Sequence, residues 1–343
     1  MTKVTHAFLL AAMLLVSLGY EDVSAAQAVA AVSAAAPAKA APGASYPEMT
    51  PDGAWCWFSD PRAIYDNGQT IVGWMNRAGD VMVGAYNIKT GVIETAALAK
   101  KFQRDDHDNP SFLVLPDGRY MAMYSKHGDG AGLRYKISTK PGSISTWGKE
   151  LYIKGPAGGK GVPVGYCYTN PSMLSAEKNR IYVYSRVVNW QPSVAWSDDL
   201  GKTWSLVHRV IASTDKRGNR PYMKTANNGK DTIYLAFTDG HPRNEPTNSI
   251  YFMKYTKGAF YKADGTKISD MKAIVAGTPI KQRECDVVHD ATGDKARCWI
   301  WDVAYDNAGN PALVYSRCPA ETKHEYWYAK FDGKTWTTTK LTD

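Results

Sequence analysis

The sequence predicts an all-β fold and, within that class, a β-propeller made of four-stranded antiparallel blades. Trp, Tyr and Phe make up 12% of the chain, and aromatic and β-branched residues alternate between turns that draw on its 29 glycines. This pattern is typical of strands, and few segments carry the 3.6-residue apolar period of a helix. A short proline-containing pattern also recurs along the chain, as expected of a repeat architecture.

The repeated pattern is a polar pair, a proline and an apolar strand. It lies near Ser59, Asp108 and Thr169, with a weaker copy at Arg220 and a fifth unit near Trp301. The copies are roughly 50 to 60 residues apart, close to the length of one propeller blade. Each unit continues with a Gly, Asn or Asp turn, two aromatic strands and a last strand that often begins with Thr-Trp. Four antiparallel strands per unit describe one blade.

One turn has a more specific pattern. The segment from Ser197 to Trp204 fits S-x-D-x-G-x-T-W, the Asp-box of sialidase-like repeats. An Asp-box joins the third and fourth strands of a blade and packs its Trp between sheets, so it supports the fold and carries no chemistry. The segment from Phe331 to Trp336 is a degenerate copy. About five blades are visible, and because the fifth ends directly after a fourth strand, we expect a truncated propeller with blades missing beyond Asp343.

The first residues are not expected to belong to the propeller. A positively charged start precedes an apolar run from Ala7 to Leu18 and small-residue cleavage patterns, which predicts a signal peptide over residues 1–25. The apolar run is too short to span a bilayer comfortably, so no membrane span is expected. Residues 26–45 are rich in Ala and Pro and indicate a linker, which leaves 46–343 for the propeller. We therefore expect a secreted or periplasmic protein.

The net charge of +8 narrows the choice of partners. A basic exported protein often meets an anionic partner, and a solvated basic surface is the simpler interpretation. Nucleic acid is a poor candidate because the chain has no Lys/Arg-rich cluster or nucleic-acid motif. We expect a monomer.

Propeller geometry assigns the polar side chains to faces. Loops that enter first strands and loops that leave second strands lie on one face, and Asp-box turns lie on the opposite face. The unusual residues just before first strands are Arg62, His107, Asn109, Tyr168, Asn170 and Tyr222. Those just after second strands are Lys126, His127, Arg186 and His241. A single loop histidine is usually only a surface residue, but this set is expected to converge on one rim around the central channel.

Three segments of the chain resemble the BNR-4 propeller family, which includes the seven-bladed ulvan lyases. They read GAWCWFSDPRA from Gly53, DHDNPS from Asp106 and TDGHPR from Thr238. The resemblance runs from about Pro47 to Asp343 and implies blades beyond the C-terminus. It also implies β-elimination on a uronic-acid polysaccharide, a sulfated ulvan cut beside glucuronic or iduronic acid.

That reaction assigns roles to the rim residues. The uronate must be neutralised, a base must take the C5 proton, and an acid must protonate the leaving oxygen. Arg186 would pair with the uronate, and His107 would be the base, with His127 assisting as base or neutraliser. Tyr168 would donate the proton, with Tyr166 as a near competitor. No cofactor is needed for this chemistry.

Five residues are expected to bind substrate in this reading. Tyr222 and His241 would position the sugar, and sulfate or carboxylate groups would be bound by Arg62, Lys126 and Asn109. The plain alternative for both Tyr168 and Tyr222 is that they stack as core aromatics.

The cysteines leave a question that the sequence does not decide. Strand pairing is expected to place residue 298 opposite about 319, which would bring Cys298 and Cys318 together. His324 would lie across the next hairpin and Cys285 in the preceding loop. Thiolate and imidazole ligands suit a structural, tetrahedral zinc ion. A Cys298–Cys318 disulfide is the alternative, and an exported location favours it.

Two other functions fit a propeller of this composition. A sialidase-type glycoside hydrolase also carries Asp-boxes and binds acidic sugars, but its arginine triad and Tyr/Glu nucleophile pair match a histidine-rich rim poorly. A non-catalytic glycan-binding propeller is the second alternative, because missing blades would leave a site incomplete. Only a lyase makes a conjugated unsaturated uronate, so ultraviolet absorbance of the product separates it from the hydrolase, and binding without product formation would favour the glycan-binding propeller.

Overall fold

A computed structural model describes residues 47–128, 131–153, 155, 164–213 and 219–342. The expected signal peptide (1–25) and linker (26–45) lie outside the described residues. Among the described residues, no helix has the length and apolar character needed to cross a membrane.

The described chain is almost entirely β-structure and forms five antiparallel sheets in sequence order. The first sheet holds β1 (Ala63–Asp66), β2 (Gln69–Met75), β3 (Val81–Asn87) and β4 (Ile93–Ala99). The second holds β5 (Ser111–Val114), β6 (Tyr120–Tyr124), β7 (Leu133–Ile137) and β8 (Leu151–Ile153). The third holds β9 (Asn170–Leu174), β10 (Arg180–Arg186), β11 (Pro192–Ser197) and β12 (His208–Arg209).

The last two sheets follow the same plan, with additions in the fourth. The fourth sheet holds β14 (Met223–Asn227), β15 (Thr232–Thr238), β16 (Ile250–Thr256), β17 (Ala259–Tyr261) and β18 (Lys267–Asp270), and β20 (Asp286–His289) pairs with β16. The fifth holds β21 (Arg297–Tyr305), β22 (Pro311–Ala320), β23 (Lys323–Phe331) and β24 (Trp336–Thr342). A small parallel pair joins β13 (Ile211–Ala212) to β19 (Ile280–Lys281). The helical segments are α1 (Met271–Val275), α2 (Ala291–Asp294) and 3-10 turns at Asp106–Asp108, Ser175–Glu177 and Gln282–Glu284.

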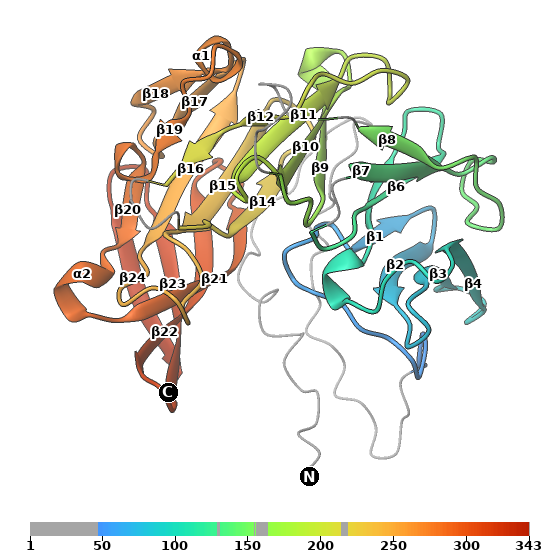
Figure 1. The fold of residues 1–343 in the computed structure, drawn as a ribbon, viewed down its shortest axis with the longest axis horizontal. Coiled ribbons are helices and arrows are strands. Elements are labelled where there is room, and N and C mark those ends of the chain that lie inside the picture. Colours follow the sequence, from blue (N-terminus) through green and yellow to red (C-terminus); the bar gives the residue numbers. More distant parts are fainter. Residues whose placement is uncertain (1–46, 129–130, 154, 156–163, 214–218, 343) are drawn as a thin grey trace.

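The sheets are arranged as propeller blades. The first strands of neighbouring sheets contact one another in the order β1, β5, β9, β14 and β21. In Figure 1 the sheets fan out around this centre, from β1–β4 on the right, past β9–β12 at the top, to β21–β24 on the left. This arrangement confirms the predicted all-β propeller with four-stranded antiparallel blades.

The cores of the protein lie between adjacent sheets. In β10, Ile181 and Val183 pack into a cluster shared with the second sheet, whereas Tyr182 and Tyr184 pack into a cluster shared with the fourth. Side chains alternate between the two faces of a strand, and both faces of this blade are covered by neighbours. A continuous run of buried aromatic and β-branched residues is the sequence signature of such a strand.

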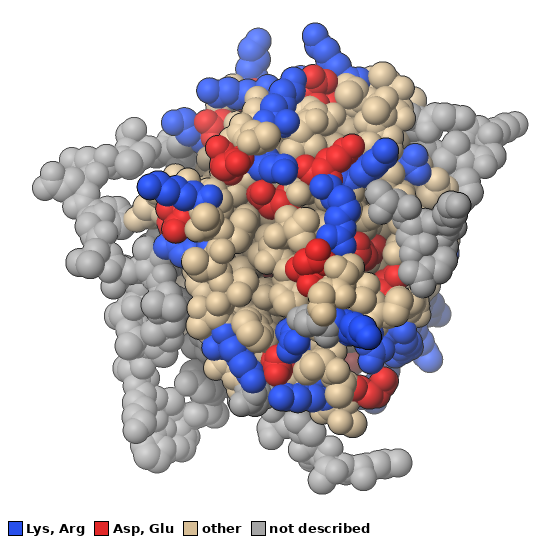
Figure 2. All heavy atoms as spheres, turned by 90° about the vertical axis from the view of Figure 1, so that its left-hand side faces the viewer, with Lys and Arg blue, Asp and Glu red and all other residues tan. Residues whose placement is uncertain are grey.

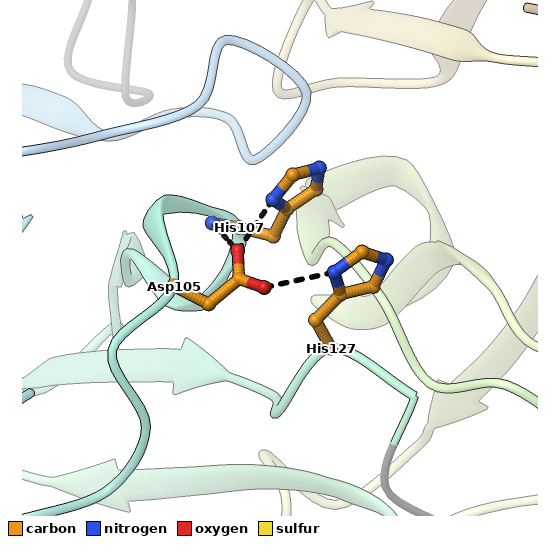
Figure 3. Close-up of side chains that lie close together, drawn as sticks. All are labelled: Asp105, His107 and His127. Atoms are coloured by element: carbon orange, nitrogen blue, oxygen red, sulfur yellow. Dashed lines mark hydrogen bonds and ion pairs between the residues drawn. The ribbon is translucent and has the colours of Figure 1, made fainter.

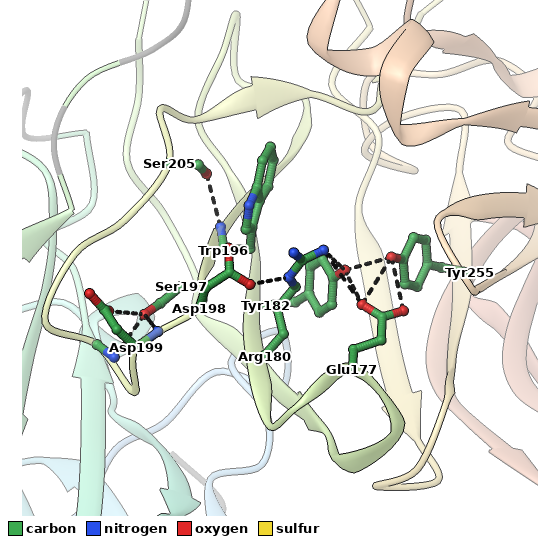
Figure 4. A network of polar contacts seen from close by, with 10 residues as sticks. Glu177, Arg180, Tyr182, Trp196, Ser197, Asp198, Asp199, Ser205 and Tyr255 are labelled. Atoms are coloured by element: carbon green, nitrogen blue, oxygen red, sulfur yellow. Dashed lines mark hydrogen bonds and ion pairs between the residues drawn. The ribbon is translucent and has the colours of Figure 1, made fainter.

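The Asp-box forms the hairpin between β11 and β12, as predicted (Figure 4). The Asp199 carboxylate accepts hydrogen bonds from Thr203 N at 2.8 Å and Thr203 Oγ1 at 2.6 Å, and Ser197 Oγ accepts from Gly201 N at 2.8 Å. Trp204 then packs 5.7 Å from the Tyr135 ring of the preceding blade. The motif therefore ties its turn to the neighbouring sheet.

A second polar network connects the third and fourth sheets on the same side (Figure 4). Tyr182 Oη donates to Glu177 Oε2 at 2.6 Å and lies 2.5 Å from Tyr255 Oη on β16. Arg180 Nε donates to Asp198 Oδ1 at 2.5 Å. The contacts among Tyr182, Glu177 and Tyr255 satisfy polar atoms that the packing of two blades would otherwise bury without partners, whereas the Arg180–Asp198 pair is exposed.

Residues 53–62, here called the central segment, contact all five sheets. Ala54 forms a bridge with Met75 of β2, and Trp57 stacks 4.7 Å from Trp301 of β21. Two asparagine side chains from the second and third repeats also hold the segment. Asn109 Oδ1 accepts a hydrogen bond from Cys56 N at 3.0 Å, and Asn170 Oδ1 accepts one from Asp60 N at 3.1 Å. The fourth sheet contributes Lys224, which donates to the Trp57 carbonyl and to the Asp60 carboxylate.

Lys224→Met is expected to destabilise the fold by about 3 kcal/mol. The Lys224 side chain is 2% exposed and pairs with Asp60, so its loss leaves a partly buried carboxylate without one of its two cations. Arg62 still pairs with Asp60 at 2.7 Å, which keeps the cost near the lower end for a broken buried pair. Urea unfolding measures the change. The control is Lys267→Met, which removes an exposed ion pair and should cost less than about 1 kcal/mol; equal costs would contradict the account.

Charged groups on the side of the fourth and fifth sheets are mixed in sign. Figure 2 shows this side, where Lys and Arg stand among Asp and Glu in the upper and lower parts of the view, with a largely uncharged area between them. The net charge of +8 is therefore not gathered into one basic patch on this face.

Candidate functional site

Two histidines and an aspartate form the first part of the site (Figure 3). Asp105 caps the 3-10 turn at Asp106–Asp108, where its carboxylate accepts a hydrogen bond from His107 N at 3.0 Å. His107 Nδ1 lies 2.6 Å from Asp105 Oδ1, and His127 Nδ1 lies 2.9 Å from Asp105 Oδ2. The two imidazole rings are nearly parallel, with centroids 4.2 Å apart. One carboxylate therefore orients both rings.

These contacts shift the pKa values of His107 and Asp105. Burial alone would lower the pKa of His107, but the hydrogen bonds and negative charges of Asp106 and Asp105 outweigh it and raise that pKa. Burial acts to raise the pKa of Asp105, but hydrogen bonds from His107 and His127 outweigh it and lower that pKa. Because Asp105 occupies both Nδ1 positions, each Nε2 points away from the carboxylate, as Figure 3 shows. A neutral ring held in this way presents a basic lone pair at Nε2.

Arg186 is the most unusual cation of the site. It ends β10 and is only 5% exposed. Its guanidinium carbon lies 4.4 Å from the centroid of Tyr222, 5.5 Å from Tyr168 and 5.4 Å from Trp190. Among the described residues no carboxylate forms an ion pair with it, and its Nε and Nη1 atoms are buried without a hydrogen-bond partner. Aromatic faces offset part of the cost of burying this charge, and two donors remain for an acidic ligand.

Tyr168 lies between the histidines and the arginine. Its ring centroid is 5.4 Å from that of His107, and burial raises its pKa well above that of a free tyrosine. Its φ is +63°, a left-handed conformation that costs energy for a residue with a Cβ. Such strain collects at functional sites. Tyr166, the near competitor, packs instead in the core between the second and third sheets.

The fourth and fifth sheets complete the rim with aromatic side chains. The Tyr222 ring lies 5.5 Å from His241 and 5.1 Å from Trp299. His241 and Trp299 are 4.3 Å apart in an edge-to-face contact. Burial, followed by the positive charges of Arg243 and Arg186, lowers the pKa of His241 to about 4. His241 is therefore neutral at physiological pH.

Comparison with known proteins places the chain in a family. A family model described as "BNR repeat-containing family member" matches residues 69–343. The chain belongs to this BNR repeat family. No curated protein matches.

Solved structures with similar folds agree with the propeller. An ulvan lyase of polysaccharide lyase family PL25, bound to -[GlcA(1-4)Rha3S]-, superposes with a TM-score of 0.67 at 17% identity, covering 84% of this chain and 72% of that chain. Another polysaccharide lyase gives a TM-score of 0.57 at 14% identity and covers 86% of this chain and 74% of the other. At these identities the likeness concerns the fold.

The BNR-family chain brings together six of the residues that the sequence places on the rim. These six form a continuous series of ring and guanidinium contacts: His127, His107, Tyr168, Arg186, Tyr222 and His241. They come from the loops and strand ends of three successive sheets and are far apart in the sequence. Only the propeller geometry therefore groups them. The expected convergence is therefore confirmed for these side chains.

The other three predicted binding residues are engaged elsewhere. Asn109 is 1% exposed and holds the central segment through Cys56 N. Arg62 pairs with Asp60 and lies 4.5 Å over the ring of Trp55. Lys126 lies 5.4 Å over the Phe102 ring. The amide oxygen of Asn109 is used by the backbone beneath the rim.

Three contributors to the site were missed from the sequence. Asp105 stands two residues before His107, and that spacing is the signal that could have revealed it. Trp190 follows β10 in a turn where its φ is +58°, and a Cβ on Gly165 would lie 1.9 Å from its ring, so a glycine is required opposite it. Trp299 belongs to the first strand of the fifth sheet, which no local motif marks.

The structure does not gather the cysteine group proposed for zinc. Cys298 pairs in register with Arg317, and Cys318 pairs with Arg297, because a bulge at Trp301 shifts β21 against β22. Neighbouring residues on a strand face opposite ways, so Cys298 and Cys318 lie on different faces of the sheet.

The remaining cysteine evidence agrees. Cys285 lies in a different core cluster from Cys298, with its Sγ 3.8 Å from Met253 Sδ. None of the five cysteines forms a disulfide. Among the described residues, Cys285, Cys298, Cys318 and His324 also do not form a group close enough to share one metal ion. Both the zinc and the disulfide interpretations were therefore wrong, and the register of β21 is the reason.

His241 is expected to make the BNR-family chain less stable in weak acid. Its folded-state pKa of about 4 lies below the usual value near 6.5, so the unfolded chain takes up a proton first and stability is lost as pH falls from about 6.5 to about 4. His241→Gln cannot titrate. Between pH 7 and pH 5 the variant should lose about 1 kcal/mol less than the wild type, measured by urea unfolding. Equal losses would show that His241 is not held neutral by the fold.

Proposed function

We propose that this chain is a polysaccharide lyase that cleaves a uronic-acid-containing polymer by β-elimination. The observation that carries the proposal is the buried Arg186 guanidinium, which has no carboxylate partner among the described residues. It lies beside Tyr168, which in turn lies against one of the two oriented imidazoles. A buried cation without a counter-ion is costly unless a ligand supplies one, and a uronate supplies the matching charge.

The first requirement of the reaction is activation of the C5 proton. That proton is weakly acidic until the neighbouring carboxylate is neutralised and can accept negative charge. The Nε and Nη1 atoms of Arg186 are two unpartnered N–H donors, and either can donate a charge-assisted hydrogen bond to a carboxylate oxygen. Their preorganised position is what lowers the barrier, because the charge on the carboxylate grows in the transition state.

The second requirement is a base, and His107 is assigned to it. Asp105 holds the His107 ring through Nδ1 at 2.6 Å, so its Nε2 lone pair faces outward. The carboxylates that raise the His107 pKa also stabilise the imidazolium that forms when the ring takes the C5 proton. His127 lies parallel to it at 4.2 Å and shares the same orienting carboxylate, which suits an assisting role.

The third requirement is an acid for the leaving oxygen, and Tyr168 is assigned to it. Its raised pKa keeps the hydroxyl protonated at neutral pH, so a proton is available when the glycosidic oxygen departs. Tyr222 and His241 border the same rim and are assigned to positioning the sugar, for which an aromatic ring beside a neutral imidazole is suited.

The finer assignment is a sulfated, ulvan-like polymer and an exported enzyme. Its support is the resemblance of the chain to the ulvan lyase bound to -[GlcA(1-4)Rha3S]-, together with the net charge of +8 and the expected signal peptide at 1–25.

The test is an absorbance assay with the purified chain. Ulvan, a heparan-type polymer and a pectic polymer are incubated separately while the ultraviolet absorbance of the conjugated unsaturated uronate is followed. The proposal expects absorbance to grow with ulvan. New reducing ends without absorbance would indicate a hydrolase, and binding without either product would indicate a glycan-binding propeller; either outcome overturns the proposal.

A further inference from the structure

We propose that Asp105, His107 and His127 form a binding site for Zn²⁺, and that zinc bound there switches the enzyme off. The site is separate from the cysteine group considered above. The inhibition rests on the proposed function, whereas the binding of zinc does not.

The ligand atoms are already gathered. One nitrogen from each histidine and one oxygen from Asp105 all lie within 4.8 Å of one another, and no other group of three His, Cys, Asp or Glu side chains among the described residues meets this distance. The side chains of His107, His127 and Asp105 are 27%, 34% and 23% exposed, so an ion can reach them from solvent. Two imidazole nitrogens and a carboxylate oxygen are a donor set that zinc commonly takes in proteins.

The two rings must tilt toward one another to accept the ion. Both Nδ1 atoms already lie beside the same carboxylate, at 2.6 and 2.9 Å, but the rings are stacked and near-parallel, so their in-plane lone pairs now run side by side. Zinc binds nitrogen and oxygen at about 2.0–2.2 Å, so the ion would sit between atoms that now share hydrogen bonds. Asp106 Oδ1 lies 2.8 Å from His107 Nδ1 and places a second negative charge beside the ion.

The inhibition follows from the tautomer. A neutral ring that donates its Nδ1–H to Asp105, as the contacts at 2.6 and 2.9 Å allow, has its basic lone pair on Nε2. When Nδ1 binds zinc, that proton leaves Nδ1 and, through solvent, a proton is taken up at Nε2, so the ring remains neutral and no charge is unaccounted for. Nε2 then carries a hydrogen and cannot accept the C5 proton. A zinc ion at this position therefore removes the base.

Binding is tested on the full chain with Co²⁺ as a spectroscopic probe and Zn²⁺ in calorimetry. We expect one ion per chain and visible cobalt bands without the charge-transfer absorption of a thiolate ligand. His127→Ala and Asp105→Asn should each weaken binding at least tenfold, and the two variants guard against a folding defect in either one. His324→Ala, from the cysteine group, is the matched control and should bind as the wild type does. Absent binding, thiolate absorption, or equal loss in the control overturns the site.

Inhibition is read in the absorbance assay with and without one equivalent of Zn²⁺. Product formation should fall at least tenfold with zinc and return after chelation. A zinc-loaded chain that cleaves at the metal-free rate overturns the inhibitory role. A chain that binds zinc but makes no product without it counts against the proposed lyase function and leaves the binding site established, so the two failures are distinguishable.

Discussion

Arg186→Met is expected to abolish cleavage while leaving the fold as stable as before or more stable. The guanidinium is assigned to the substrate carboxylate, and removing one preorganised donor at a developing negative charge typically costs about a hundred- to a thousandfold in rate. Here both donors go, so a loss of about a thousandfold or more is expected. Replacing a buried, unpaired charge by an apolar side chain of similar length is neutral or stabilising.

The expected loss of cleavage without a loss of stability separates a role in the reaction from a folding defect. Activity is measured by ultraviolet absorbance of the product and stability by urea unfolding. Arg180→Met is the matched control, because Arg180 begins the same strand β10 and pairs with Asp198 at its far end. The control should keep its activity. An Arg186→Met variant that cleaves normally would remove the guanidinium from the proposed mechanism, and one that unfolds would contradict the expected stability.

His107→Ala is expected to lower the cleavage rate by about a hundred- to a ten-thousandfold, the range for loss of a general base. His127→Ala should also reduce the rate, because it shares Asp105 with His107. Residues that act as a unit are not additive, so the double variant should be little worse than the more damaging single variant. Initial rates at saturating substrate measure all three variants.

His208→Ala is the control for the histidine variants, because His208 lies on β12 and stacks on Trp196 away from the rim. Its rate should equal that of the wild type. Full activity in both His107→Ala and His127→Ala would show that the proton is taken by another group.

The fold was predictable because propeller blades repeat a local pattern. The proline-containing repeat and the Asp-box at Ser197 marked where strands begin and turn, and both depend on residues close in sequence. The register of β21 was not predictable, since the bulge at Trp301 depends on packing with other parts of the chain. The turn pairs Tyr305 with Pro311, and the bulge then brings Cys298 opposite Arg317, so the observed register differs from the expected one at both places. The contacts of the central segment with all five sheets were likewise invisible in the sequence.

The site was predictable to the extent that topology, rather than local sequence, determines it. His107, His127, Arg186 and His241 converge because loops at equivalent positions of successive blades share one face. Side-chain roles beneath that face were not predictable. Asn109 stands at an equivalent position, yet its amide oxygen faces inward and holds the backbone of Cys56. Residues that orient other residues leave little trace in a single sequence.

The most direct test follows deuterium placed at C5 of the uronate in the polymer. If the rim performs β-elimination, every cleavage must break the C5–D bond, so one deuterium should pass to solvent per glycosidic bond cleaved, and cleavage should be slower than with unlabelled polymer. Cleavage that leaves the deuterium on the product would contradict the account, because hydrolysis does not touch C5.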